Sequence, residues 1–105
     1  MTDIIPFDKR DGYIWYNGEM INWKDAKVHI LNHGLHYASS VFEGERIYSK
    51  KIFKSKLHSQ RLHKSAQILG FEIPYSVDEL EVAKQEISAK QNIEDGYMRA
   101  FAWRG

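Results

Sequence analysis

Three arginines are the residues of this sequence best suited to chemistry, because each guanidinium can bind a carboxylate or a phosphate through parallel hydrogen bonds. Arg46 follows Gly44 by two residues, and Arg99 follows Tyr97 by two. In a strand, residues two apart share one face, so each pair would present a cation beside a ligand-sized space or a phenol. Arg61 lies in a segment that we expect to be a helix packed on the same sheet. Together these groups form a candidate receptor for anions.

Each of these residues also has a plainer interpretation. Arginines are common on protein surfaces, and Arg61 could simply pair with a glutamate. The stretch 41–48 could be a half-buried strand with a bulge at Gly44 and with Arg46 on a solvated face. Glycine inside a strand marks either such a bulge or the close approach of a ligand, so the residues alone leave both interpretations open.

Alternation along two predicted strands decides which side chains would share a face. The first strand, 41–48, would send two sets of side chains to opposite faces: Phe42, Gly44, Arg46 and Tyr48 to one, and Val41, Glu43, Glu45 and Ile47 to the other. The second strand, 97–103, would send Tyr97, Arg99, Phe101 and Trp103 to one face. Gly44, which has no side chain, would leave space beside Phe42.

The remaining elements are predicted from turn and cap residues. Asn17-Gly18 between two apolar runs predicts a hairpin of 13–16 and 19–23, because both turn positions need a positive φ. A helix is predicted from Ser55 or Lys56 to Leu69, with its apolar stripe at Leu62, Ala66 and Leu69 and with Gly70 ending it. A second helix follows Pro74, with a capping box at Ser76 and Glu79 and a stripe at Leu80, Ala83 and Ile87.

The order of these elements predicts an α+β fold, a mostly antiparallel sheet with two helices on one face. We expect residues 1–12 to form an N-terminal arm and residues 13–105 to form a single domain.

Three histidines, His29, His33 and His36, have spacings that suggest a metal site. Ordinary hydrogen-bonded histidines are the better interpretation, because Asn32 and Gly34 interrupt the helical pattern and zinc needs three or four converging ligands.

Composition narrows the classes of partner. The 105 residues are 43% apolar and 28% charged with a net charge of +1, which gives no reason to expect nucleic acid or an anionic membrane as a partner. The sequence has no cysteine and therefore no disulfide or thiolate metal site. It has no apolar run of membrane-spanning length either. A cytoplasmic location is the default expectation.

The sequence of residues 12–105 resembles that of a known protein family. HYASSVFEGERIY closely resembles the segment that introduces the active site in branched-chain amino acid aminotransferases, which are fold-type IV enzymes using pyridoxal 5′-phosphate (PLP). Four further stretches match that family in the same order: YIWYNGEMINWKDAKVHILNHGLHY, KIFKSKLHSQRLHKSAQILGF, PYSVDEL and GYMRAFAWRG. The fold implied is the N-terminal small domain of such an enzyme, and the activity implied is transfer of the amino group of leucine, isoleucine or valine to 2-oxoglutarate.

The resemblance also implies roles for seven residues. Arg61 matches the arginine that holds the cofactor phosphate, and Tyr97 with Arg99 matches the pair that places the substrate carboxylate. The other matches line the substrate pocket, with Tyr37 reaching the pocket of a neighbouring subunit and three residues forming the side-chain wall: Phe42, Gly44 and Arg46. If these roles hold, Arg61 should point toward the face of the sheet that carries Tyr97 and Arg99.

Members of that family are longer than this chain, and their Schiff-base lysine lies in a second domain that we expect beyond Gly105. No catalytic residue is therefore assigned here, and we expect the 105 residues alone to be inactive, to hold PLP weakly and to form a homo-oligomer. Two alternatives remain open. One is a non-catalytic remnant or self-associating module, and the other is a relative of D-amino acid aminotransferases or aminodeoxychorismate lyases.

Overall fold

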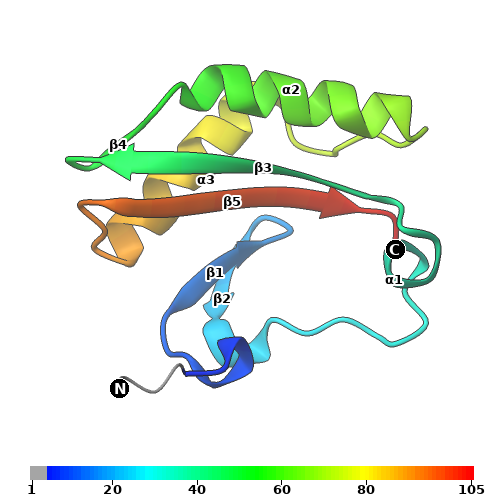
Figure 1. Cartoon of the computed structure of the whole chain (residues 1–105), viewed down its shortest axis with the longest axis horizontal. Coiled ribbons are helices and arrows are strands. Elements are labelled where there is room, and N and C mark those ends of the chain that lie inside the picture. Colours follow the sequence, from blue (N-terminus) through cyan, green and yellow to red (C-terminus); the bar gives the residue numbers. More distant parts are fainter. Residues whose placement is uncertain (1–4) are drawn as a thin grey trace.

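The structure is a computed structural model that describes residues 5–105, and it contains two separate antiparallel sheets (Figure 1). The smaller sheet pairs β1 (Tyr13–Tyr16) with β2 (Glu19–Asn22). The larger has the order β4-β3-β5 and consists of β3 (Ser40–Tyr48), β4 (Lys51–Ile52) and β5 (Gly96–Trp103). The helices are α1 (His33–Tyr37), α2 (Ser55–Ile68) and α3 (Val77–Lys90), with short 3-10 turns η1 (Phe7–Lys9) and η2 (Trp23–Asp25). The predicted α+β class is confirmed.

The β1–β2 hairpin turns where the sequence predicts it. Asn17 and Gly18 both have positive φ, 47° and 86°, as a two-residue hairpin turn of this kind requires. The hairpin does not join the larger sheet; instead Trp15 packs edge-on against Tyr75, with ring centroids 5.1 Å apart. This contact attaches the hairpin to the segment that leads into α3.

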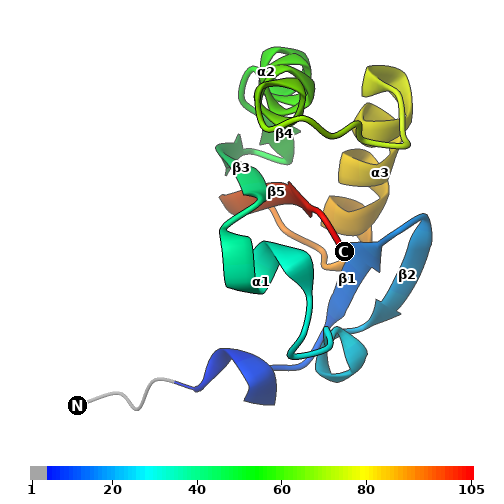
Figure 2. The ribbon, with the colours of Figure 1, turned by 90° about the vertical axis from the view of Figure 1, so that its right-hand side faces the viewer.

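The core of the domain lies between the larger sheet and the two long helices. In Figure 2, α2 lies above the sheet, α3 runs down beside α2, and α1 and the hairpin lie below. Residues 41, 43, 45 and 47 of β3 are buried beneath the helices, whereas their neighbours at even numbers are exposed. The buried apolar residues come from four elements: Val41, Ile47, Ile52, Leu62, Ala66, Leu80 and Ala83.

The predicted helix caps agree with the structure better than the predicted apolar stripes do. The capping box is confirmed, since Glu79 N donates to Ser76 Oγ and Ser76 N donates to Glu79 Oε1, both at 3.1 Å. Leu69, expected in the buried stripe, is 45% exposed, because α2 ends at Ile68 and the chain turns away through Gly70 at φ 83°. Serine completes the buried face of α2, which consists of Ser59, Leu62 and Ala66.

The short helix α1 is absent from the sequence prediction because its cap looks like a helix breaker. The Asn32 side chain accepts a hydrogen bond from Gly34 N at 3.0 Å, so the asparagine begins a helix. The three histidines each contact a near neighbour: His29 with Leu31 N, His33 with Ser39 Oγ, and His36 with Ile30 O. In residues 5–105 no group of three or more histidine, cysteine, aspartate or glutamate side chains is placed to hold a metal ion.

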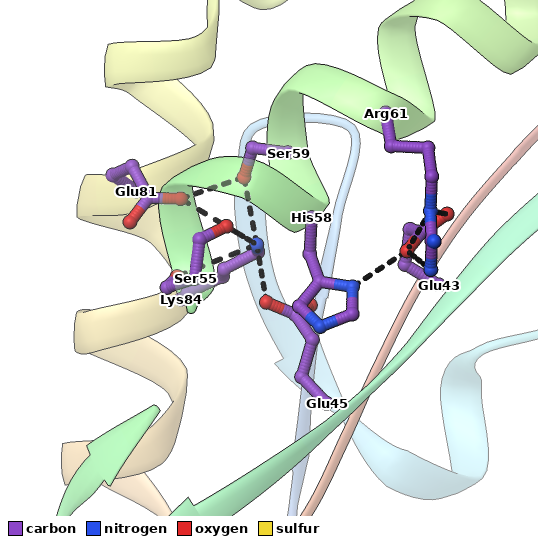
Figure 3. Close-up of polar contacts among 8 residues, drawn as sticks. All are labelled: Glu43, Glu45, Ser55, His58, Ser59, Arg61, Glu81 and Lys84. Atoms are coloured by element: carbon purple, nitrogen blue, oxygen red, sulfur yellow. Dashed lines mark hydrogen bonds and ion pairs between the residues drawn. The ribbon is translucent and has the colours of Figure 1, made fainter. Parts of the chain in front are cut away.

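A charged cluster is buried between α2, α3 and β3 (Figure 3). Lys84 of α3 is 4% exposed, and its Nζ donates to Glu45 Oε1 of β3 and to Ser59 Oγ of α2, both at 2.7 Å. Glu81 Oε1 accepts from Ser59 Oγ at 2.6 Å. Burial raises the pKa of Glu45 above its ordinary value, and the ion pair with Lys84 opposes that rise. The lysine therefore compensates a carboxylate that has no access to water.

We predict that Lys84→Met lowers the free energy of unfolding at pH 7 by about 3 kcal/mol, because it leaves the Glu45 carboxylate buried without its cation. Combining it with Glu45→Gln should recover most of the loss. The loss in the single variant should also narrow as pH falls, since a carboxylate whose folded pKa is raised is protonated more readily in the folded state. Urea unfolding followed by circular dichroism measures each value, with exposed Lys64→Met as the control. If the double variant loses as much free energy of unfolding as Lys84→Met alone, Lys84 does not stabilise the fold by compensating Glu45.

Candidate functional site

The face of the larger sheet that α2 and α3 leave uncovered carries most of the predicted site residues. We call it the free face and define it by seven exposed residues of β3 and β5: Phe42, Gly44, Arg46, Tyr48, Tyr97, Arg99 and Phe101. The register of the two strands sets these residues directly opposite one another: Phe42 with Phe101, Gly44 with Arg99, and Arg46 with Tyr97. Residues paired in this way project from the same face. The structure therefore brings five of the seven predicted residues together.

Tyr97 and Arg99 lean across the sheet onto β3. A Cβ placed on Gly44 would lie 2.5 Å from Tyr97 Oη and 3.1 Å from its ring, so the phenol covers the glycine. The Arg99 guanidinium lies 4.0 Å from the centroid of the Phe42 ring. The expected space beside Phe42 is thus filled by the Tyr97 ring in this structure, because a glycine on one strand accepts an aromatic ring from the next.

All of the charged side chains on this face are cationic within the three strands. Arg46 and Arg99 project from its centre, and Lys51 of β4 joins them opposite Tyr48. The two acidic residues of β3, Glu43 and Glu45, point to the other side, where they are 5% and 1% exposed. A face with aromatic rings, guanidiniums and no carboxylate from its strands suits a ligand that is apolar at one end and anionic at the other.

Arg61 does not lie on the free face, and the expectation that it would face Tyr97 and Arg99 is wrong. The reason is that α2 packs on the opposite side of β3, so Arg61 meets Glu43 there. Figure 3 shows Arg61 and His58 reaching the same carboxylate from successive turns of α2. Since β4 pairs only with Ile47 and Tyr48, the earlier part of β3 has an edge that β4 leaves unpaired. A ligand touching both Arg61 and the free face would have to pass around that edge.

The contact between Arg61 and Glu43 is a close ion pair. Arg61 Nε lies 3.0 and 2.9 Å from the two oxygens of Glu43, and Nη2 lies 2.7 Å from Oε1. The hydrogen bond from Arg61 holds the pKa of Glu43 below its ordinary value, and burial of the carboxylate works in the opposite direction. The plainer interpretation of Arg61, a pairing with a glutamate, is therefore present in the structure.

Tyr37 lies apart from the other predicted residues. It is the last residue of α1, is 73% exposed, and its ring lies 4.6 Å from the His33 ring, centroid to centroid, with the two planes tilted by 39°. Figure 1 shows α1 beyond the ends of β3 and β5.

The sequence does not predict Glu43 and His58 as site residues, although both hold Arg61 in place. The spacing of His58 and Arg61 was the available signal, since residues three apart lie on one helix face and can share a carboxylate.

Comparison with known proteins gives a consistent result. A model of the family described as Amino-transferase class IV matches residues 40–105, which include β3, both long helices and β5. A probable branched-chain-amino-acid aminotransferase from Rickettsia typhi is 48% identical over 93 residues, covering 89% of this chain and 32% of that protein. The chain thus spans about a third of the length of the curated relatives it matches.

Solved structures share the fold. The branched-chain amino acid aminotransferase of Escherichia coli has a TM-score of 0.87 at 44% identity, covering 91% of this chain and 34% of that one. The PLP form of the branched-chain enzyme from Thermobaculum terrenum has a TM-score of 0.78 at 28% identity, covering 89% of this chain and 33% of that one.

Among the helices of residues 5–105, none has both the length and the apolar composition that a membrane-spanning helix needs.

We predict that the stability provided by Glu43 depends on pH. Because its folded pKa lies below the ordinary value of 4.5, its contribution is present above pH 4.5 and is lost as pH falls through the folded pKa. The difference in free energy of unfolding between the unaltered chain and Glu43→Gln should therefore be largest near neutral pH and should shrink below pH 4.5. Glu72→Gln, at an exposed carboxylate, controls for the loss of one charge. A difference that stays constant from neutral pH to strong acid would refute the prediction.

Proposed function

Since the chain belongs to the class IV aminotransferase family, we propose that it forms the substrate-facing domain of a PLP-dependent branched-chain amino acid aminotransferase. Such an enzyme transfers the amino group of leucine, isoleucine or valine to 2-oxoglutarate. The relatives with this name are about three times as long, so we propose that the catalytic lysine belongs to the part of the enzyme outside these 105 residues. We further propose that the protein works in the cytoplasm.

The observation that carries the proposal is the composition of the free face. A branched-chain amino acid combines an aliphatic side chain with an α-carboxylate. Arg99 and Tyr97 offer a cation and a hydroxyl for the carboxylate, and they stand directly opposite Gly44 and Arg46 in the sheet. Phe42 supplies an apolar wall 4.0 Å from the Arg99 guanidinium. Binding the carboxylate here would orient the α-carbon while the apolar side chain excludes water.

Although Arg61 does not face Tyr97 and Arg99, we propose that it holds the cofactor phosphate from the other side of β3, reached around the edge of that strand that β4 leaves unpaired. Its side chain is 66% exposed although the guanidinium is paired with Glu43. Within residues 5–105 no hydrogen bond involves its Nη1, so that nitrogen retains two donors for an anion. The donor chemistry therefore fits a phosphate group. When bound, PLP supplies the electron sink that makes the α-proton of an amino acid removable.

The other predicted residues take their places in the same proposal. Arg46 would line the substrate side-chain pocket with Phe42 and Gly44, since all three lie on the free face, and the Tyr97 ring that covers Gly44 would form part of the same pocket wall. Tyr37 would reach the pocket of a neighbouring subunit, in keeping with its exposed position at the end of α1. Self-association is also supported by β5, an edge strand of eight residues whose outer side lacks a partner strand within residues 5–105.

The test is a chimera in which this chain replaces the corresponding first third of the Escherichia coli branched-chain enzyme. We predict that the chimera forms glutamate from leucine and 2-oxoglutarate. Arg99→Ala in the chimera should lower kcat/KM for leucine about 10- to 100-fold, the effect of losing charged hydrogen bonds to a carboxylate. Lys51→Ala, on the same face but at its margin, is the matched control and should leave kcat/KM nearly unchanged.

A folded, PLP-containing chimera that transaminates D-alanine but not leucine would contradict the branched-chain assignment. It would favour the alternative relationship to enzymes acting on D-amino acids. Equal activity of the Arg99→Ala and Lys51→Ala chimeras would contradict the role given to the free face.

A further inference from the structure

Glu43 is a buried carboxylate in contact with Arg61, and the proposed function gives it no role. It stands between Phe42 and Gly44 in β3 but points to the helix side, where its side chain is 5% exposed. A carboxylate in this position loses most of its hydration, which costs free energy unless cations and donors replace the water. Two residues of α2, His58 and Arg61, provide that replacement.

The geometry of the ion pair fixes the orientation of Arg61. Glu43 binds one edge of the guanidinium through Nε and Nη2, at distances of 2.7 to 3.0 Å. Because the guanidinium is planar and rigid, holding that edge also sets the direction of the remaining nitrogen, Nη1. An arginine that is 66% exposed would otherwise sample many rotamers, and binding an anion would have to order it.

His58 fixes the carboxylate in turn. Its Nδ1 lies 2.6 Å from Glu43 Oε1, so the ring donates a hydrogen bond to the same oxygen that accepts from Arg61 Nη2. The His58 side chain is only 20% exposed, and Figure 3 shows its ring between Glu43 and Glu45. The carboxylate is therefore held by β3 at its base and by two turns of α2 at its oxygens.

A purely electrostatic view gives the opposite expectation for anion binding. A negative charge about 3 Å from a guanidinium lowers the potential that attracts a phosphate, so removing it would strengthen binding. If instead Glu43 pre-orients Arg61, removing it weakens binding because the side chain must be ordered by the ligand. The two effects differ in sign, which makes them separable by one substitution.

We propose that Glu43 and His58 are positioning residues for the cofactor phosphate: they hold the Nε–Nη2 edge of Arg61 and thereby present its Nη1 edge to the phosphate. The proposal rests on the phosphate role of Arg61 stated under the proposed function. It also links the two sides of β3, because Glu43, which orients Arg61, stands in the strand between two residues of the free face, Phe42 and Gly44.

The test titrates the 105-residue chain with pyridoxine 5′-phosphate, which has the ring and phosphate of the cofactor but no aldehyde to react with lysines. Pyridoxine, without phosphate, is the parallel ligand. Dissociation constants come from NMR titrations at low salt, because exposed charge pairs are screened by salt. The Arg61 Nε–H resonance supplies a second readout, since its exchange with water reports directly whether Glu43 holds that edge.

We expect Glu43→Gln to weaken pyridoxine 5′-phosphate binding about 2- to 10-fold, the cost of ordering one long side chain, and to accelerate exchange at Arg61 Nε–H. Glu43→Asp keeps the charge but shortens the reach, so it should weaken binding in the same direction. His58→Phe should have a smaller effect of the same sign. Pyridoxine binding should be unchanged in every variant, and Glu72→Gln, at an exposed carboxylate, is the matched control.

The variants separate this proposal from the role of Arg61 itself. If Arg61→Ala binds pyridoxine 5′-phosphate as well as the unaltered chain, or the unaltered chain shows no phosphate-dependent binding, the phosphate role fails and the positioning role with it. If Arg61→Ala loses binding while Glu43→Gln keeps it or binds more tightly, only the positioning role is overturned. Should Glu43→Gln fail to fold, His58→Phe and Glu43→Asp decide in its place, and unchanged affinity in both overturns the proposal.

Discussion

Two glutamates on one face of β3 must be compensated for this domain to fold, and their compensation organises the rest of the structure. Alternation along a strand sends Glu43 and Glu45 beneath the helices, where both are almost fully buried. Arg61 and His58 contact the carboxylate of Glu43, and Lys84 contacts that of Glu45. Because the cations come from α2 and α3, the ion pairs fix where both helices sit on the sheet.

The same alternation keeps acidic groups off the free face. Each glutamate that points to the helices leaves a neighbour on the other side, and these neighbours are Phe42, Gly44 and Arg46. The strand therefore separates a compensated, largely buried polar layer from an open face with cations and aromatic rings. In the proposed function, the substrate would meet the open face, and the phosphate would meet Arg61, which is the most exposed of the three side chains that compensate the glutamates.

Local signals predicted much of the fold. Asn17-Gly18 and the Ser76–Glu79 box are determined by backbone geometry within a few residues, and both formed as predicted. The pattern of β3 and β5 predicted which residues share a face, because a period of two is a property of the strand itself. The resemblance to branched-chain aminotransferases is matched by the comparisons, with relatives of that name at 44–50% identity.

What the sequence could not supply depends on tertiary packing. Lys84 and Glu45 look like ordinary surface charges until α3 is placed over β3, and only then do they meet at 2.7 Å. The side of the sheet that α2 covers decides the face on which Arg61 lies, and alternation alone leaves that choice open. Asn32 interrupts an apolar pattern and yet caps α1, because the same side chain can break a helix or begin one.

In the proposed function, the free face of the sheet, and not the helix side, receives the carboxylate of an aliphatic substrate. The most direct measurement is an NMR map of the 105-residue chain titrated with 4-methylvalerate, a branched aliphatic carboxylate without an amino group. We expect the largest shifts at Gly44 and Arg99, which face each other across β3 and β5. Shifts centred on His58 and Arg61, with Gly44 and Arg99 unaffected, would contradict it.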